Sequence, residues 1–241
     1  MRWVFLFSCC FTCFFSFSQS KPVRLTENTI VKDSSGTLYP YETWRSMLMH
    51  GYMLKAVDPK NENTEFILVK LSEKQQAERL ERMGKPRESA FLKTGDRFQP
   101  FKTKDIDGNK IDLKALEGKI VVLNFWFVDC PPCRAEIPDL NKLVDSFKTN
   151  DKLVFIAIAL DSKSSLKSFL KKTPFNYTII HEGKFLADKY GIHSFPTHVV
   201  IDTEGKIYFH TTGLSPNTVY WLNKTIKELL GSKDGTTVSN Q

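Results

Sequence analysis

Cysteine is scarce in this chain once its N-terminal end is set aside. Five cysteines occur among 241 residues, and three of them, Cys9, Cys10 and Cys13, lie within the first 18 residues. The remaining pair, Cys130 and Cys133, has no further thiol with which to bond. This scarcity excludes a fold held together by several disulfides. A structural zinc site would need two more Cys or His ligands at matching spacing, and no second cysteine pair exists. Redox chemistry is therefore the leading hypothesis.

The chain also lacks an apolar run long enough to cross a membrane comfortably, which takes about 20 residues. Its N-terminal apolar stretch follows one positive charge, Arg2, and closes with small residues before Gln19. This layout predicts a secretory signal peptide over residues 1–18, cleaved after Ser18. The alternative is a lipoprotein site at Cys9, although the apolar stretch before that residue is very short. Both interpretations place the protein in a periplasmic or other extracytoplasmic compartment, where disulfides persist.

A stripe of positive charge is absent as well. The formal net charge is +7, and removal of Arg2 with the signal peptide leaves +6 (7 − 1). The lysines are scattered among acidic residues, which is typical of a solvated surface and does not indicate a nucleic-acid partner. Hydrophobic residues make up 41% of the chain, and its 19 phenylalanines are enough for a substantial core.

Breakers and charges over residues 84–96 suggest a linker. We therefore predict a signal peptide at 1–18, a small N-terminal α+β extension with its linker at 19–95, a main domain at 96–231 and a disordered tail at 232–241. Within the extension, the pattern predicts strands at 29–32 and 65–71 and helices at 41–50 and 72–83. The extension matches no recognised motif. Docking, partner binding and dimerisation all remain open roles, and the oligomeric state is not determined.

The main domain alternates strands with helices. A hairpin with a type I′ turn is expected at Asp107-Gly108, and the apolar run at 119–127 predicts a strand buried on both faces. Further strands are expected at 153–160, 177–180, 197–201 and 206–210, and helices at 132–147, 164–172, 184–190 and 218–230. This order predicts an α/β domain with a central mixed sheet that helices cover on both faces.

The Cys-x-x-Cys pair falls where the first long strand ends and a helix begins. We expect the sulfur of Cys130 to be exposed there and to meet free N–H groups at the positive end of the helix dipole. Both features favour the thiolate, which is the attacking species. Cys133, one turn into the helix, is expected to be buried and to resolve the mixed disulfide. Pro131 and Pro132 stiffen the turn and remove two N–H donors.

Several further residues extend this pattern into a family resemblance. The sequence resembles the thioredoxin-like proteins of the TlpA/ResA type over residues 96–230. The residues that carry the resemblance are Asn124-Phe125-Trp126, Cys130-Pro131-Pro132-Cys133, Glu136, Pro138 and Ser194-Phe195-Pro196-Thr197. It implies a thioredoxin-like fold and an exported thiol–disulfide oxidoreductase that needs no cofactor. The implied partners are disulfide-containing exported proteins and a membrane electron donor that restores the dithiol. Several members of the family supply reductant for cytochrome c maturation.

The resemblance also assigns roles to single residues. Cys130, Cys133 and Glu136 are expected to be catalytic, with Glu136 passing protons to and from Cys133 because both share one helix face. Pro196 is expected to follow a cis peptide bond and to shape the groove for the partner. The residues expected to bind substrate with it are Trp126, Phe195 and Thr197. The family usually has Trp before the first cysteine, whereas this chain has Asp129, which puts its partner range in doubt.

Other functions compete with this one. Cys130, Cys133 and His198 could bind copper and deliver it, which makes metal delivery the alternative to disulfide reduction. His198 could instead be an ordinary histidine of the sheet. Peroxide reduction needs a Pro-x-x-x-Thr-x-x-Cys frame, and the residues before Cys130 do not supply one. Finally, the N-terminal extension could hold the main activity, with the redox domain serving only its tethered partner.

Overall fold

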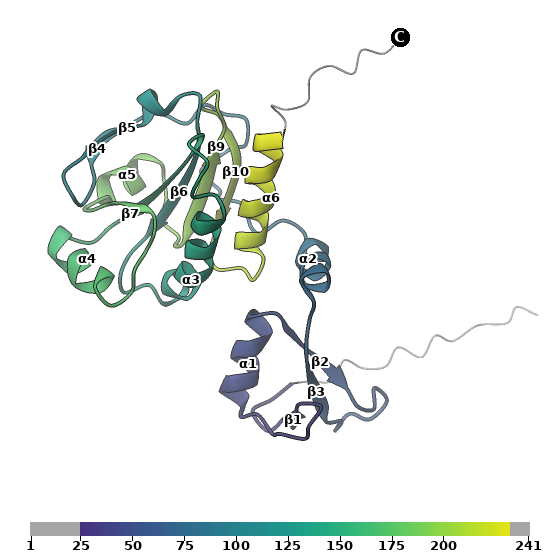
Figure 1. Ribbon diagram of the computed structural model, residues 1–241. Helices are drawn as coiled ribbons and strands as arrows, with labels where there is room; N and C mark the ends of the chain where they lie inside the picture. Colours follow the sequence, from purple (N-terminus) through teal and green to yellow (C-terminus); the bar gives the residue numbers. More distant parts are fainter. Residues whose placement is uncertain (1–24, 232–241) are drawn as a thin grey trace, which may run out of the picture. The chain divides into compact units, whose positions relative to one another are not determined.

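The computed structural model describes residues 25–231 and divides into two compact units between Glu73 and Lys74. Figure 1 shows both units along the chain. The signal peptide and the tail expected from the sequence lie outside the described residues. The predicted domain boundary at residue 95 remains a prediction, since residues 74–95 group with the second unit. No helix within residues 25–231 is both long and apolar enough to cross a bilayer.

The first unit is a three-stranded sheet covered by one helix (Figure 1). Its elements are β1 (Val31–Lys32), α1 (Tyr41–Met49), β2 (Tyr52–Ala56) and β3 (Phe66–Lys70), with strand order β1-β3-β2. Trp44 of α1 is 2% exposed and packs with buried Val31, Phe66 and Leu68. The sequence analysis missed β2 because only alternate residues of this strand face the helix. A strand of that kind shows no continuous apolar run.

The second unit holds the remaining elements. They are α2 (Glu73–Arg82), β4 (Lys102–Lys104), β5 (Lys110–Asp112), the 3₁₀ helix η1 (Leu113–Leu116), β6 (Ile120–Trp126), α3 (Pro131–Ser146), β7 (Leu153–Ala159), α4 (Lys163–Leu170), β8 (Thr178–Ile180), α5 (Lys184–Lys189), β9 (Thr197–Ile201), β10 (Ile207–Thr212) and α6 (Thr218–Gly231). The main sheet has the order β10-β9-β6-β7-β8. β7 runs parallel to β6 and β8, whereas β9 runs antiparallel to β6 and β10. The prediction of a central mixed sheet is therefore confirmed.

The central strand β6 is buried on both faces, as its apolar run predicted. Val122 and Trp126 belong to one core cluster, which α3, α4 and α6 complete, and Leu123 and Phe125 belong to the other, which includes Leu186 of α5. All seven residues of β6 are buried. A strand with two covered faces can hold a polar residue only where that residue finds partners inside the core. Asn124 is that residue in β6.

The hairpin of β4 and β5 differs from the prediction in its turn. Lys104 pairs with Lys110, so residues 105–109 form the loop instead of a two-residue type I′ turn. The Asp105 carboxylate accepts hydrogen bonds from the backbone N–H groups of Asp107 and Asn109 at 2.9 and 2.8 Å. These bonds cap a longer loop locally, which is a common role of Asp in turns. The type I′ prediction was therefore wrong.

Residues 87–98 run along the outer edge of β10. The carbonyl of Arg87 accepts a hydrogen bond from the Thr212 N–H at 2.9 Å, and the Gly95 N–H donates to the Ile207 carbonyl at 2.7 Å. These bonds satisfy part of an edge that would otherwise be free to pair with another chain. The sequence identified this stretch as a linker because of its breakers, and the structure shows that part of it covers the sheet edge.

A buried histidine at the same edge, His210, predicts that the protein loses stability at acidic pH. The Ser89 N–H donates to Nδ1 of His210, which is 2% exposed. Burial lowers the pKa of His210 below its ordinary value of 6.5, and the Glu88 charge offsets this only in part. The unfolded chain then binds a proton that the folded protein does not. The contribution of neutral His210 to the free energy of unfolding is therefore fully present above pH 6.5 and is lost as the pH falls below this value.

Urea unfolding of the wild type and of His210→Asn, at about pH 7.5 and about pH 5.5, checks this expectation. Asparagine offers a carbonyl oxygen to the Ser89 N–H but does not titrate. We expect the wild type to lose more stability than the variant between the two pH values. Equal losses in the two proteins would contradict the assignment.

Candidate active site

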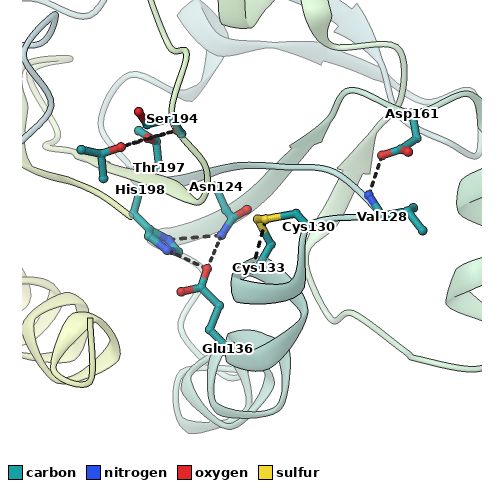
Figure 2. The surroundings of a disulfide bond; sticks show 10 residues. Asn124, Val128, Cys130, Cys133, Glu136, Asp161, Ser194, Thr197 and His198 are labelled. Carbon is teal, nitrogen blue, oxygen red and sulfur yellow. Dashed lines mark hydrogen bonds and ion pairs between the residues drawn. A yellow bond between two sulfur atoms is a disulfide. The ribbon is translucent and has the colours of Figure 1, made fainter. Parts of the chain in front are cut away.

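The two cysteines lie at the start of α3, directly beyond the end of β6. They form a disulfide with an S–S distance of 2.02 Å, so the described state is the oxidised one (Figure 2). Cys130 is the N-cap of α3, and its sulfur accepts a hydrogen bond from the Cys133 N–H at 3.2 Å. Pro131 and Pro132 occupy the first two helical positions and have no N–H to offer. Cys133 therefore supplies the first backbone donor of the helix, and it donates to the sulfur of Cys130.

The sulfur of Cys130 is less accessible than the sequence suggested. Cys130 and Cys133 are each 2% exposed, and both belong to the core cluster on the α3 side of the sheet. Phe127, Val128 and Phe195 pack against that cluster. The expectation of an exposed Cys130 was therefore wrong for the oxidised state, because apolar neighbours close around the disulfide. The position of Cys130 at the helix N-terminus still favours its thiolate over that of Cys133.

A carboxylate that sequence analysis missed fixes the loop before Cys130. The Val128 N–H donates to the Asp161 carboxylate at 2.8 Å, as Figure 2 shows. Asp161 follows β7, which lies parallel to β6, so both strands end at the same edge of the sheet. The parallel pairing of β6 and β7 is the signal that would have pointed to Asp161. Asp129 itself is exposed beside the disulfide.

Behind the disulfide lies a buried cluster of three polar side chains, Asn124 of β6, Glu136 of α3 and His198 of β9 (Figure 2). They are 1%, 5% and 0% exposed. Nε2 of His198 lies 2.9 Å from Oε1 of Glu136. The Asn124 amide nitrogen donates to the same oxygen at 3.2 Å and lies 3.3 Å from Nδ1 of His198. Asn124 and His198 are direct register partners in the antiparallel pair of β6 and β9.

This cluster places a carboxylate inside the core one turn after Cys133. Within the described part of the chain, Oε2 of Glu136 and Oδ1 of Asn124 are buried and have no hydrogen-bond partner. Burying such groups is costly, and uncompensated polar atoms of this kind are concentrated at functional sites. The Glu136 charge also acts on Tyr177, which is 4% exposed. Burial and then that charge raise the pKa of Tyr177 well above its ordinary value.

The loop before β9 has the predicted cis peptide bond between Phe195 and Pro196. Pro196 is buried, and Phe195 is half-buried with its ring edge-on to Phe127 at a centroid distance of 5.5 Å. The hydroxyl of Thr197 donates to the Ser194 carbonyl at 2.7 Å. These contacts connect the loop to the segment before Cys130 and leave part of the Phe195 ring accessible.

Two of the residues expected to bind substrate are enclosed. Trp126 is 1% exposed and packs between Phe169 and Phe175 at centroid distances of 5.6 and 5.4 Å. Thr197 is also 1% exposed. A direct contact of either side chain with a partner protein is therefore not supported, since the core surrounds both. Their placement instead gives them a role in packing the core.

The geometry of His198 does not favour the copper alternative. Its Nε2 lies 2.9 Å from Oε1 of Glu136 and its Nδ1 lies 3.3 Å from the Asn124 amide nitrogen, so both ring nitrogens face the polar cluster and not the disulfide. Among residues 25–231, no group of three or more His, Cys, Asp or Glu side chains has the spacing to hold a metal ion. The imidazole belongs to the polar cluster behind the disulfide.

The part of the chain that holds this site is similar in sequence to known thiol–disulfide oxidoreductases. Residues 94–210 match the AhpC/TSA family. Thiol-disulfide oxidoreductase ResA of Halalkalibacterium halodurans is 31% identical over 140 residues, which cover 57% of this chain and 80% of that protein. ResA of Bacillus thuringiensis is 32% identical over 117 residues, which cover 48% of this chain and 68% of that protein.

Solved structures are similar to the same part of the chain. A Chlorobium tepidum protein assigned as thiol:disulfide interchange protein DsbE has a TM-score of 0.53 and 28% identity, over 58% of this chain and 99% of that one. A thiol:disulfide interchange protein from a Bacteroides species has a TM-score of 0.51 and 26% identity, over 60% and 95%. With its thioredoxin-like sheet and its disulfide at the start of α3, the chain belongs to the ResA-type thiol–disulfide oxidoreductases.

Proposed function

We propose that this enzyme is exported and reduces disulfides of partner proteins through the Cys130–Cys133 pair. The observation that carries the proposal is the disulfide at the N-terminus of α3 with the buried Glu136 one turn behind it. The helix start favours a thiolate at Cys130. The carboxylate supplies a group that accepts and returns the proton of Cys133.

The reaction consists of two exchanges. In the dithiol form, the Cys130 thiolate attacks one sulfur of the partner's disulfide, so a mixed disulfide forms and one partner thiolate leaves. Cys133 then gives its proton to Glu136 and attacks the Cys130 sulfur, which releases the second partner thiolate. The partner gains two electrons and takes two protons to become a dithiol, and the enzyme is left oxidised. A membrane electron donor returns the pair to the dithiol form.

The loop at Phe195 and Pro196 supports a binding surface for the partner's chain, because half-buried Phe195 packs against Phe127 in the segment before Cys130. The predicted signal peptide supports an extracytoplasmic location. Apocytochrome c is the partner class that the ResA-type family implies. Asp129 is exposed beside the disulfide where the family usually has Trp, so we expect a partner range different from that of the relatives.

The equilibrium reduction potential tests the direction of electron flow. We expect a value well below about −180 mV, the potential typical of an isomerase, as a reductase requires. Thiol trapping of the chain from Gln19 in dithiothreitol and glutathione buffers would measure it. A potential near −120 mV, the oxidant end of that scale, would contradict the reductase proposal. The absence of a reversible couple would contradict the redox role of the pair.

A further inference from the structure

We propose that His198 is a positioning residue that holds the Glu136 carboxylate ready to accept the proton of Cys133. The inference rests on the proposed role of Glu136 and extends it to a residue on another strand. His198 lies on β9, two residues beyond Pro196, and its side chain is fully buried. It meets Glu136 across the interface between the sheet and α3, as Figure 2 shows.

The neighbours of the imidazole determine which of its nitrogens carries the hydrogen. The amide nitrogen of Asn124 lies 3.3 Å from Nδ1 of His198. An amide nitrogen only donates hydrogen bonds, so Nδ1 must be the acceptor. The ring hydrogen of the neutral imidazole is then on Nε2, which is 2.9 Å from Oε1 of Glu136. His198 therefore turns an N–H, and not a lone pair, toward the carboxylate, although the contact is not aligned as a hydrogen bond in the oxidised state.

The two donors act on the same carboxylate oxygen. Oε1 accepts a hydrogen bond from the Asn124 amide and lies 2.9 Å from Nε2 of His198, whereas Oε2 is buried without a partner among the described residues. Hydrogen bonds to one oxygen fix the orientation of the carboxylate and stabilise its charge in the core. The other oxygen stays free to take a proton. Without His198, the buried carboxylate would lose a polar neighbour that holds its orientation.

Two other ionisable side chains, Cys133 and Tyr177, lie near Glu136 and His198. Cys133 is one turn earlier on α3 and is the proton donor in the proposed step. Tyr177 precedes β8, and its hydroxyl is buried without a hydrogen-bond partner in the described region. Burial and the Glu136 charge keep this phenol neutral in the physiological pH range, since both raise its pKa. Asn124, the third neighbour, does not titrate. Glu136, His198 and Cys133 are therefore the groups at this site whose protonation can enter the resolving step.

The step can be followed directly with Ellman's reagent. Reduced protein releases one thionitrobenzoate when Cys130 attacks the reagent. It releases a second when Cys133 loses its proton, bonds to the Cys130 sulfur and displaces the remaining thionitrobenzoate. Stopped-flow absorbance over a range of pH separates the two phases. The first phase reports on Cys130 and on intact folding, and the second reports on resolution by Cys133.

Two replacements of His198 separate hydrogen bonding from filling of space. His198→Leu removes the donor, and we expect the second phase to slow at least about tenfold near neutral pH, as loss of a hydrogen bond to a charged group implies. His198→Gln places an amide N–H near the former Nε2 position, and we expect a rate within about threefold of wild type because the donor is kept. His50→Leu replaces an exposed histidine of the first unit and is the matched control.

The outcomes discriminate clearly. A second phase in His198→Leu that is as fast as in the wild type would overturn the proposal. Equal slowing of the second phase in His198→Leu and His198→Gln would overturn it as well. An unchanged second phase in Glu136→Gln would instead contradict the proposed role of Glu136. Should His198→Leu not fold, nitrogen NMR of the histidines in the oxidised wild type decides the matter. We expect the Nε2–H tautomer for His198, and the Nδ1–H tautomer would overturn the proposal.

Discussion

Cys130→Ser is expected to abolish disulfide reduction, with a fall in rate on the order of 10³-fold or more, as removal of a nucleophile usually produces. The physical reason is the place of Cys130 at the N-cap of α3. Its sulfur accepts the first backbone hydrogen bond that the helix offers, and the helix dipole adds to this stabilisation of a thiolate. The measurement is the initial rate of reduction of a disulfide-containing protein such as insulin, with dithiothreitol as the source of electrons.

Cys133→Ser is the matched control for that experiment. This variant keeps the attacking thiol but lacks the resolving one, so it should accumulate the mixed disulfide with its partner. On a nonreducing gel, we expect a covalent complex with Cys133→Ser and none with Cys130→Ser. Cleavage of this complex by dithiothreitol would support the assignment. The reverse pattern would show that Cys133 attacks first. Burial alone does not decide between them, because both cysteines are 2% exposed.

Glu136→Gln is expected to slow the resolving step by about 10²-fold near neutral pH, the lower end of what general acid–base catalysis contributes. Glutamine has nearly the same shape and keeps an oxygen for the hydrogen bond from Asn124 and for the contact with His198, but it accepts no proton in this pH range. The second phase of the reaction with Ellman's reagent measures the effect. Its rate should then rise with pH only as far as Cys133 ionises unaided.

Asp139→Asn is the control for this substitution. Asp139 lies on the same helix, where it pairs with Lys142 at 2.8 Å, so its replacement removes a carboxylate of α3 away from the buried cluster. We expect its second phase to match the wild type. Equal slowing in both variants would mean that the total charge of the helix matters and would remove the special role of Glu136.

Most of the sheet was predictable because its strands carry continuous apolar runs. Ile120–Trp126 and Leu153–Ala159 are buried over nearly all their length, and a run of that kind is typical of a strand with two covered faces. Tyr52–Ala56 was missed for the opposite reason, since one face of that strand is left partly open. The loop at 105–109 was mistaken for a tight turn because Asp-Gly is a strong local signal that the Asp105 hydrogen bonds override.

The active site was predictable in part. Cys130, Cys133 and Glu136 lie within one helix, so their sequence spacing already places them on neighbouring turns. Asp161 and the partners of Glu136 come from other strands. From the sequence, His198 is a candidate copper ligand or an ordinary sheet histidine, because nothing local shows that β9 pairs with β6 in the register that sets it opposite Asn124.

The sequence by itself determined the fold family, the redox pair and the helix on which that pair begins. These features depend on local periodicity and on residues close together in the chain. Only the tertiary structure decided that the disulfide is enclosed and that Asp161 anchors its loop. It also brought Glu136, Asn124 and His198 together on one carboxylate oxygen. The reason is physical: strand register and the packing of α3 on the sheet are long-range properties, and each depends on side chains far apart in the sequence.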